Sequence, residues 1–246
     1  NVKNKKTLVV IPARYDSSRF PGKPLVNIKG VPMIQRTYSQ ALKNKYTKDI
    51  VVATDSKRIY SFCNENNMNV VMTSNSCLSG TDRVAEVAND SQDYDCYVNL
   101  QGDEPVINPI YIDKCIESFY GSYPKYDVIT GYGLLSKNSV NLKEKVKVVV
   151  NSNSEAIYFS RLPIPFNSKQ YFNHIGLYCF SSEALKIFSN REVGTSESCE
   201  KVEMIGMIEL GVKIKMVEME ETFTVDIPSD IDKVKSFLDK FEYKVK

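Results

Sequence analysis

Apolar and polar positions along the first 130 residues predict strands and helices in alternation. Short apolar runs rich in Val and Ile are typical of strands buried on both faces. These runs occupy residues 7–13, 49–55, 69–73 and 95–100. Apolar side chains three and four positions apart predict helices between them, at residues 32–44, 56–66, 80–90 and 108–120. The fold class expected from this order is α/β, with a Rossmann-like, mostly parallel sheet and helices on both faces.

The pattern becomes strand-rich from about residue 125 onward. Strands are predicted at 127–135, 145–151, 155–161 and 173–180. They suggest a smaller β-rich insertion or lid with antiparallel pairs. Later segments predict helices at 181–190 and 199–211, strands at 213–219 and 222–225, and a last helix at 226–241. Since no repeat or linker interrupts the chain, we expect one domain over 1–246 that includes the β-rich segment at about 125–200.

Composition narrows the class of protein only slightly. Apolar residues make up 42% and charged residues 25% of the 246 residues, and the formal net charge is +2. This balance gives no reason to expect binding to nucleic acid or to a membrane surface. Six cysteines without a C-x-x-C pair, together with a single histidine, argue against a zinc site and favour a reduced, cytoplasmic protein.

The loop after the first strand gathers positive charge around a Pro-Gly turn. Arg14, Arg19 and Lys23 surround Gly22, and exposed backbone N–H groups beside such cations suit a polyphosphate. The alternative is a solvated basic loop. The sequence matches neither G-x-x-x-x-G-K-[ST] nor G-x-G-x-x-G, so it is not one of the two standard glycine-rich phosphate loops.

Two aspartates follow predicted strands. Asp103 lies in "LQGDEP" and Asp226 follows "TFTV". Ligands in open α/β sheets bind beyond the carboxyl ends of the strands, and Mg²⁺ takes one or two carboxylates plus phosphate oxygens. A turn carboxylate at Asp103 and a helix N-cap at Asp226 are the alternatives. Together with the basic loop, the two aspartates predict metal-assisted nucleotidyl transfer.

Specific motifs point to a known family. "IPARYDSSRFPGKPL", "SGTDRVAEV", "VNLQGDEP", "EAIYFSRLPIP", "HIGLYCF", "EKVEM" and "VDIPSDIDKV" occur in this order between about residues 7 and 238. In this the chain resembles the CMP-KDO synthetases (3-deoxy-manno-octulosonate cytidylyltransferases). The resemblance implies a Mg²⁺-dependent homodimer that activates a sugar acid with CTP and releases pyrophosphate, in lipopolysaccharide or capsule synthesis. It also implies that 1–246 is a single nucleotidyltransferase domain, with an acceptor and dimerisation segment at about 125–200.

The resemblance also implies roles for individual residues. Those expected to bind the nucleotide are Pro12, Ala13, Arg14, Ser17, Arg19, Lys23, Ser79, Gly80, Arg83, Gln101 and Asp103. Those expected to carry catalysis are Arg14, Lys23, Asp103 and Asp226, of which the two aspartates would hold the metal. Those expected to face the sugar acid are Gln101, Arg161, His174, Tyr178, Glu200 and Glu203. By itself a lone histidine in a strand is more often structural.

The chain departs from the family pattern on the acceptor side. Gly206, Met207 and Glu209 replace the family's usual Glu-Gln pair and Arg, and Phe166, Asn167 and Ser168 replace its usual residues after "IP". The sequence therefore defines the identity of the sugar-acid substrate less closely than it defines CTP as the nucleotide. The alternatives are 8-amino-KDO, a nonulosonic or sialic-like acid, or a homologue that binds CTP without catalysis.

Overall fold

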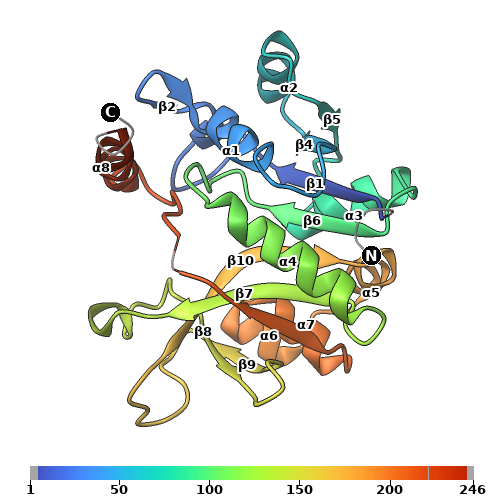
Figure 1. The fold of residues 1–246 in the computed structure, drawn as a ribbon, viewed down its shortest axis with the longest axis vertical. Coiled ribbons are helices and arrows are strands. Elements are labelled where there is room, and N and C mark those ends of the chain that lie inside the picture. The colour runs from blue at the N-terminus through green and yellow to red at the C-terminus, as the bar shows by residue number, and fades with distance from the viewer. Residues whose placement is uncertain (1–4, 221, 243–246) are drawn as a thin grey trace.

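A single mixed sheet organises the molecule. The computed structural model describes residues 5–220 and 222–242, and helices cover both faces of the sheet (Figure 1). The strands are β1 (Thr7–Pro12), β4 (Ile50–Thr54), β5 (Val70–Met72), β6 (Cys96–Leu100), β7 (Val128–Leu134), β8 (Lys147–Val150), β9 (Ala156–Ser160), β10 (Phe172–Phe180) and β11 (Ile214–Glu218). A separate hairpin pairs β2 (Asn27–Ile28) with β3 (Val31–Pro32).

The main path of the sheet runs β11-β7-β10-β6-β1-β4-β5. Strands β6, β1, β4 and β5 are parallel, and β11 is parallel to β7. Strand β10 is antiparallel to both of its neighbours, β6 and β7. The predicted α/β class with a mostly parallel sheet is thus confirmed, with β10 as the reversed strand.

Two apolar layers sandwich the sheet because both faces of its central strands are apolar. Val9 and Ile11 point to the layer that packs α1 (Met33–Ala41), α2 (Lys57–Glu65) and α4 (Pro109–Ser122). Leu8 and Val10 point to the opposite layer, under α3 (Gly80–Asp90), α5 (Ser182–Asn190) and α7 (Glu203–Glu209). Burial on both sides holds these strands rigidly, so the loops at their carboxyl ends start from fixed positions.

The strand-rich segment belongs to the same sheet as the N-terminal strands. β7 and β10 lie in its main path, and β8 pairs with both β10 and β9. The antiparallel pairs expected in this segment are present. β9 is hydrogen-bonded to β8 and lies at the end of this extension (Figure 1).

Three predicted elements differ in the structure. The helix expected over 199–211 is two helices, α6 (Thr195–Glu200) and α7, because Lys201 between them adopts a left-handed φ of 53°. The strand expected at 222–225 is irregular, and the last helix, α8 (Asp230–Glu242), begins four residues later than predicted. Asp226 is therefore not its N-cap; instead the Asp230 carboxylate accepts the backbone N–H groups of Asp226 and Ile227.

Helix α8 packs beside the β2–β3 hairpin rather than on the main sheet (Figure 1). Val234 of this helix shares a small buried cluster with Ile28, Met33, Val106 and Val225. The segment that carries Asp226 thus runs between the sheet and a separate apolar anchor. Within the described residues, none of the helices is long and apolar enough to cross a membrane.

Candidate active site

A cavity of about 330 Å³ opens beyond the carboxyl ends of β1 and β6. Every residue predicted to bind the nucleotide lines this cavity, from Pro12 at the end of β1 to Asp103 after β6. Asp226, near the other end of the sequence, lines it as well. Elements that are distant in the sequence therefore converge on one site, as the strand-end argument predicted.

The basic loop owes its shape to Gly22. This residue has a φ of 71°, and its N–H donates to the Tyr15 carbonyl at 2.8 Å. A Cβ at Gly22 would lie 3.1 Å from the Tyr15 hydroxyl, so the tight turn requires glycine. Arg14 is exposed, and no hydrogen bond or ion pair engages its guanidinium within residues 5–220 and 222–242. Arg14 thus presents its full set of donors to a ligand.

Lys23 links the basic loop to the first strand-end aspartate. Its ammonium donates to Asp103 Oδ2 at 2.8 Å and to the Val225 carbonyl at 2.9 Å. Burial raises the pKa of Asp103, and the Lys23 charge works against that rise. Both side chains are largely buried, so the pair is held in a defined geometry.

The second oxygen of Asp103 has no protein partner. Asp103 Oδ1 is buried and accepts no hydrogen bond from the described residues. Such an atom is costly unless a ligand supplies the missing contact. Asp226 lines the same cavity and is paired with Arg19 at 3.9 Å, at the outer limit of an ion pair.

These two carboxylates fit a magnesium site with few protein ligands better than a site in which protein side chains supply every ligand. Within the described ranges there is no cluster of three or more His, Cys, Asp or Glu side chains that could hold a metal. Mg²⁺ commonly uses one or two carboxylates and completes its shell with phosphate oxygens and water. Asp103, which lines a cavity with cationic walls and has one unpartnered oxygen, meets that requirement together with Asp226.

The first turn of α3 forms another wall of the cavity. Ser79 caps this helix by accepting the N–H of Asp82, and the Asp82 carboxylate accepts the N–H of Ser79 in return. A Cβ at Gly80 would lie 3.0 Å from the Gln101 amide and 3.1 Å from Pro12. Gly80 therefore allows the helix terminus to approach β1 and β6 closely.

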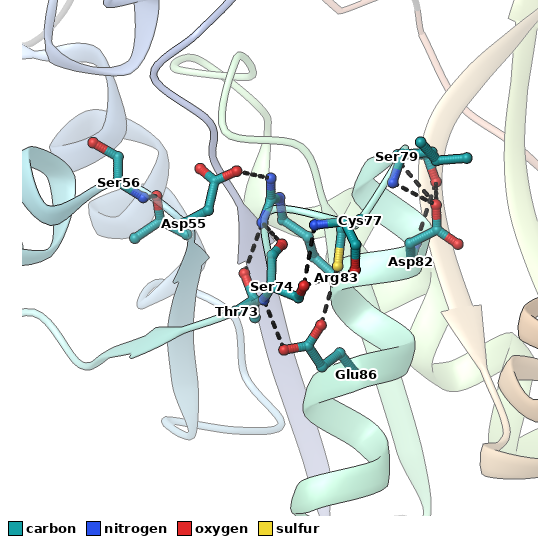
Figure 2. A network of polar contacts seen from close by, with 12 residues as sticks. Asp55, Ser56, Thr73, Ser74, Cys77, Ser79, Asp82, Arg83 and Glu86 are labelled. Atoms are coloured by element: carbon teal, nitrogen blue, oxygen red, sulfur yellow. Dashed lines mark hydrogen bonds and ion pairs between the residues drawn. The ribbon is translucent and has the colours of Figure 1, made fainter.

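Arg83 is fixed by a network behind that wall (Figure 2). Its guanidinium donates to Asp55 at 2.6 Å, to the Thr73 hydroxyl at 2.8 Å and to the Ser74 carbonyl at 3.0 Å. Only 4% of its side chain is exposed. Arg83 therefore shapes the cavity as a fixed element, with much of its donor capacity already used.

A second cavity, of about 670 Å³, adjoins the first. Arg19 and Asp226 line both cavities. The remaining walls come from the strand-rich segment, including Lys145 and His174, and from Thr222, Thr224 and Lys233 near the C-terminus. A bound molecule in the second cavity would thus lie next to whatever occupies the first.

His174 is the predicted acceptor residue that lines this second cavity. Its ring lies edge-on to Phe159 and Tyr178, and its Nε2 is 3.1 Å from the Thr130 hydroxyl. Burial lowers its pKa to about 4, so the imidazole is neutral near pH 7. Tyr178 lies behind His174 and does not itself line either cavity.

Glu203 is tied to the first cavity through a chain of polar groups. Gln101 donates to Asn99, Asn99 donates to the Thr81 hydroxyl, and Thr81 donates to Glu203 at 3.0 Å. Burial raises the pKa of Glu203. Gln101 lines the first cavity directly, whereas Glu203 lies at the other end of this chain.

Arg161 and Glu200 are placed together but away from both cavities. The Arg161 guanidinium donates to three backbone carbonyls, those of Glu200, Lys143 and Lys201. The Glu200 carboxylate accepts the backbone N–H of Arg161. In this arrangement the Arg161 donors are bonded to protein carbonyls. The guanidinium is therefore not available to bind a substrate carboxylate, which is the role expected from the resemblance.

The departures from the family pattern also lie outside the cavities. A Cβ at Gly206 would lie 2.0 Å from a Glu197 oxygen, so this glycine leaves room for the buried Arg191–Glu197 ion pair. Met207 is fully buried in the core, and Phe166 is 97% exposed. Neither Gly206, Met207 nor Glu209 lines either cavity.

Asp55 and Lys145 are site residues that the sequence analysis did not select. Asp55 follows β4 directly, so the strand-end argument that singled out Asp103 applies to it as well. No comparable signal marks Lys145, which reaches the second cavity through the fold of an irregular loop.

Comparison with known proteins shows the family to which the chain belongs. The family model described as cytidylyltransferase matches residues 8–237. The 3-deoxy-manno-octulosonate cytidylyltransferase of Chlorobium limicola is 40% identical over 243 residues, covering 94% of this chain and 96% of that protein. The 8-amino-3,8-dideoxy-manno-octulosonate cytidylyltransferase of Shewanella pealeana is also 40% identical, over 231 residues, covering 91% and 94%.

A solved structure resembles the whole chain. The CMP:2-keto-3-deoxy-manno-octonic acid synthetase, solved in complex with CTP, superposes with a TM-score of 0.91 at 36% identity and covers 96% of this chain and 99% of its own. A cytidylyltransferase from Leptospira borgpetersenii shares the fold, with a TM-score of 0.67 at 17% identity. The resemblance found in the sequence motifs is confirmed.

Proposed function

The chain belongs to the cytidylyltransferase family, and on that premise we propose that it activates a 3-deoxy-octulosonate-type sugar acid with CTP. The anomeric hydroxyl oxygen of the sugar acid forms a bond to the α-phosphorus. The bond from that phosphorus to the bridging oxygen of the β-phosphate breaks, the hydroxyl proton is released, and pyrophosphate leaves. The products are a CMP-sugar and pyrophosphate.

The single observation that supports this reaction best is the shared wall of the two cavities. A cation-lined cavity with an unpartnered carboxylate oxygen suits a nucleoside triphosphate and its metal. The adjoining cavity suits a second, polar molecule, and Arg19 and Asp226 border both. Two substrates bound there would meet at that border, which is what an in-line transfer between them requires.

The basic loop would hold and orient the triphosphate. Arg14 offers a planar fork of donors, which suits two phosphate oxygens at once. Lys23 lies between the loop and Asp103, and its ammonium can neutralise phosphate charge without leaving the carboxylate. Ser79 and Gly80 border the other side of this cavity and would contact the nucleoside.

Asp103 and Asp226 would hold the magnesium ion. When bound, Mg²⁺ would supply neutralisation of the phosphate charge and a lowered pKa of the attacking hydroxyl. The protein's own part is to leave one buried carboxylate oxygen of Asp103 without a protein partner in the wall of the first cavity, and to present Asp226 at the border of the second.

The second cavity would orient the sugar acid. The neutral imidazole of His174 can hydrogen-bond a sugar hydroxyl while Phe159 and Tyr178 fix its ring plane. Arg19 and Lys145 border the cavity and could face the sugar carboxylate. Arg161 would join them only after giving up carbonyl contacts that it makes in this structure.

The 8-amino sugar acid is the second candidate. The Glu144 carboxylate is exposed and lines the second cavity, where it could pair with an ammonium group. Relatives at 40% identity are named for each of the two sugar acids, so similarity does not choose between them.

A pyrophosphate-release assay tests the function. The purified protein is supplied with CTP, Mg²⁺ and either KDO or 8-amino-KDO, with EDTA as the control. Release that depends on both Mg²⁺ and one sugar acid supports the proposal and names the acceptor. CTP binding without pyrophosphate release, for either acceptor and for a sialic acid, would indicate a non-catalytic homologue instead.

The same proposal includes a cytoplasmic homodimer. Ile157, Leu162 and Phe166 are 52%, 63% and 97% exposed in and just after β9, at the end of the sheet extension, and a second copy could cover them. All six cysteines are free thiols, which fits a reducing compartment. Sedimentation of the wild type and of Phe166→Asp tests the dimer, since the charge should shift the equilibrium toward monomer.

A further inference from the structure

Asp103 lies three residues after the end of β6, whereas the described residues around Asp226 belong to no strand. Residues 222–226 have no regular secondary structure. Their backbone contact with the loop after β6 is one hydrogen bond, from the Val225 N–H to the Asp103 carbonyl at 3.0 Å. If the two aspartates act on one ion, other contacts must set the position of the second.

Glu104 supplies such contacts from the residue next to Asp103. Its side chain is only 4% exposed. Its Oε1 accepts the Thr224 hydroxyl at 2.8 Å and the Thr222 hydroxyl at 3.3 Å. The two threonines therefore flank Phe223 on one side of the segment and direct both hydroxyls to a single carboxylate oxygen.

Lys23 makes a second link between the segment that carries Asp226 and the loop after β6. Its ammonium contacts both the Asp103 carboxylate and the Val225 carbonyl. Beyond Asp226, the Asp230 carboxylate accepts the Asp226 N–H at 3.0 Å. Asp226 is thus bracketed by Glu104 and Lys23 before it and by the start of α8 after it.

We propose that Glu104, through Thr222 and Thr224, is a positioning residue that holds Asp226 at the distance from Asp103 that one Mg²⁺–triphosphate complex requires. This inference rests on the proposed function. Glu104 lines neither cavity and contacts no substrate in this scheme. Its carboxylate takes the place of the missing strand pairing, because it joins the irregular segment to the loop that follows β6.

The test separates metal-dependent nucleotide binding from folding. The affinity for CTP is measured by calorimetry, without a sugar acid, once with Mg²⁺ and once with EDTA. The ratio of the two dissociation constants reports how much the metal contributes. Partners one shell beyond a metal ligand typically change metal affinity by about 10- to 100-fold.

The key variant is Thr222→Val combined with Thr224→Val, which keeps the side-chain shape and removes both hydroxyls. We expect the Mg²⁺ contribution to CTP affinity to fall by about tenfold while the affinity in EDTA stays unchanged. Thr222→Ser combined with Thr224→Ser keeps the hydroxyls and should restore the wild-type ratio. If the double valine variant does not fold, Thr224→Val alone removes the shorter bond and should give a smaller loss of the same kind.

A matched control removes a hydroxyl elsewhere. Thr47 donates to the Thr7 carbonyl at 2.7 Å, away from both cavities. Thr47→Val should lower the melting temperature without changing the Mg²⁺ ratio. The inference is overturned if the folded valine variant keeps the wild-type ratio, or if its affinity falls equally with Mg²⁺ and EDTA. A wild-type protein that binds CTP but shows no Mg²⁺-dependent pyrophosphate release would instead refute the proposed function.

Discussion

The basic loop and the strand-rich segment use their cations in opposite ways. In the nucleotide half, Arg14 has no partner within the described part of the chain and Lys23 keeps one face toward the cavity. In the strand-rich segment, Arg161 and Lys147 line neither cavity: Arg161 gives its donors to three carbonyls, and the buried Lys147 ammonium donates to three others. A charged side chain near a site is thus available to a ligand only if the protein leaves its donors unused.

The difference follows from what each half must build. The first cavity is framed by the ends of strands that are buried on both faces, so its loops need few extra contacts to hold their shape. The wall of the second cavity at residues 142–146 is irregular. Lys147 and Arg161 stabilise that wall by donating to the carbonyls of Leu142, Lys143 and Lys145.

The largest expected effect comes from removing the negative charge of Asp103. We expect Asp103→Asn to lower kcat by about 100-fold or more, because a direct metal ligand should matter at least as much as an outer partner. The isosteric amide should preserve the fold. Pyrophosphate release and thermal unfolding measured on the same sample check both statements, and a folded variant with wild-type turnover would remove Asp103 from the metal site.

Lys23→Ala tests the nucleotide half alone. Loss of a charge-assisted contact costs about 1.5–3 kcal/mol, so the KM for CTP should rise about tenfold or more. The KM for the sugar acid should change much less, since Lys23 does not line the second cavity. Steady-state kinetics with each substrate varied in turn measures both. Equal changes in the two KM values would contradict the proposal that CTP and the sugar acid bind in separate cavities.

Asp55→Asn gives a smaller effect on the same half. The Asp55–Arg83 ion pair is nearly buried, but asparagine can still accept one hydrogen bond from Arg83. We expect the KM for CTP to rise about threefold to tenfold, with Arg83 still bound to Thr73 and Ser74. Kinetics for CTP measures this, and an unchanged value would make the network in Figure 2 a purely structural feature.

The smallest effect concerns the acceptor half and appears in stability. Burial lowers the pKa of His174 from 6.5 to about 4, so between these values the unfolded chain binds a proton that the native protein does not. Stability from this residue is therefore present above pH 6.5 and is lost as the pH falls toward 4. His174→Gln should reduce the drop in melting temperature between pH 7 and pH 5 by about 4–7 °C. An identical drop in both proteins would contradict the depressed pKa.

The nucleotide half was largely predictable from the sequence. Strand periodicity placed the loops after β1 and β6 at one edge of a sheet, and residue chemistry then selected Lys23 and Asp103. Helices α2, α3 and α4 were also predicted, because the spacing of their apolar side chains is a local signal.

The acceptor half was less predictable because its geometry depends on long-range contacts. "TFTV" has the alternation of a strand, yet its hydroxyls bind Glu104, 118 and 120 residues away. Arg161 carries the right charge for a carboxylate, but three distant carbonyls take its donors. The helix breaks at Lys201, where no Gly or Pro marks the end of a helix in the sequence. None of these contacts leaves a periodic or local signal.

The most direct test of the account is a crystal structure of the protein with CTP and Mg²⁺. The account predicts that the triphosphate lies in the first cavity against Arg14 and Lys23, with the metal bound to Asp103 Oδ1 and to Asp226. A triphosphate bound outside that cavity, or a metal that contacts neither aspartate, would contradict it.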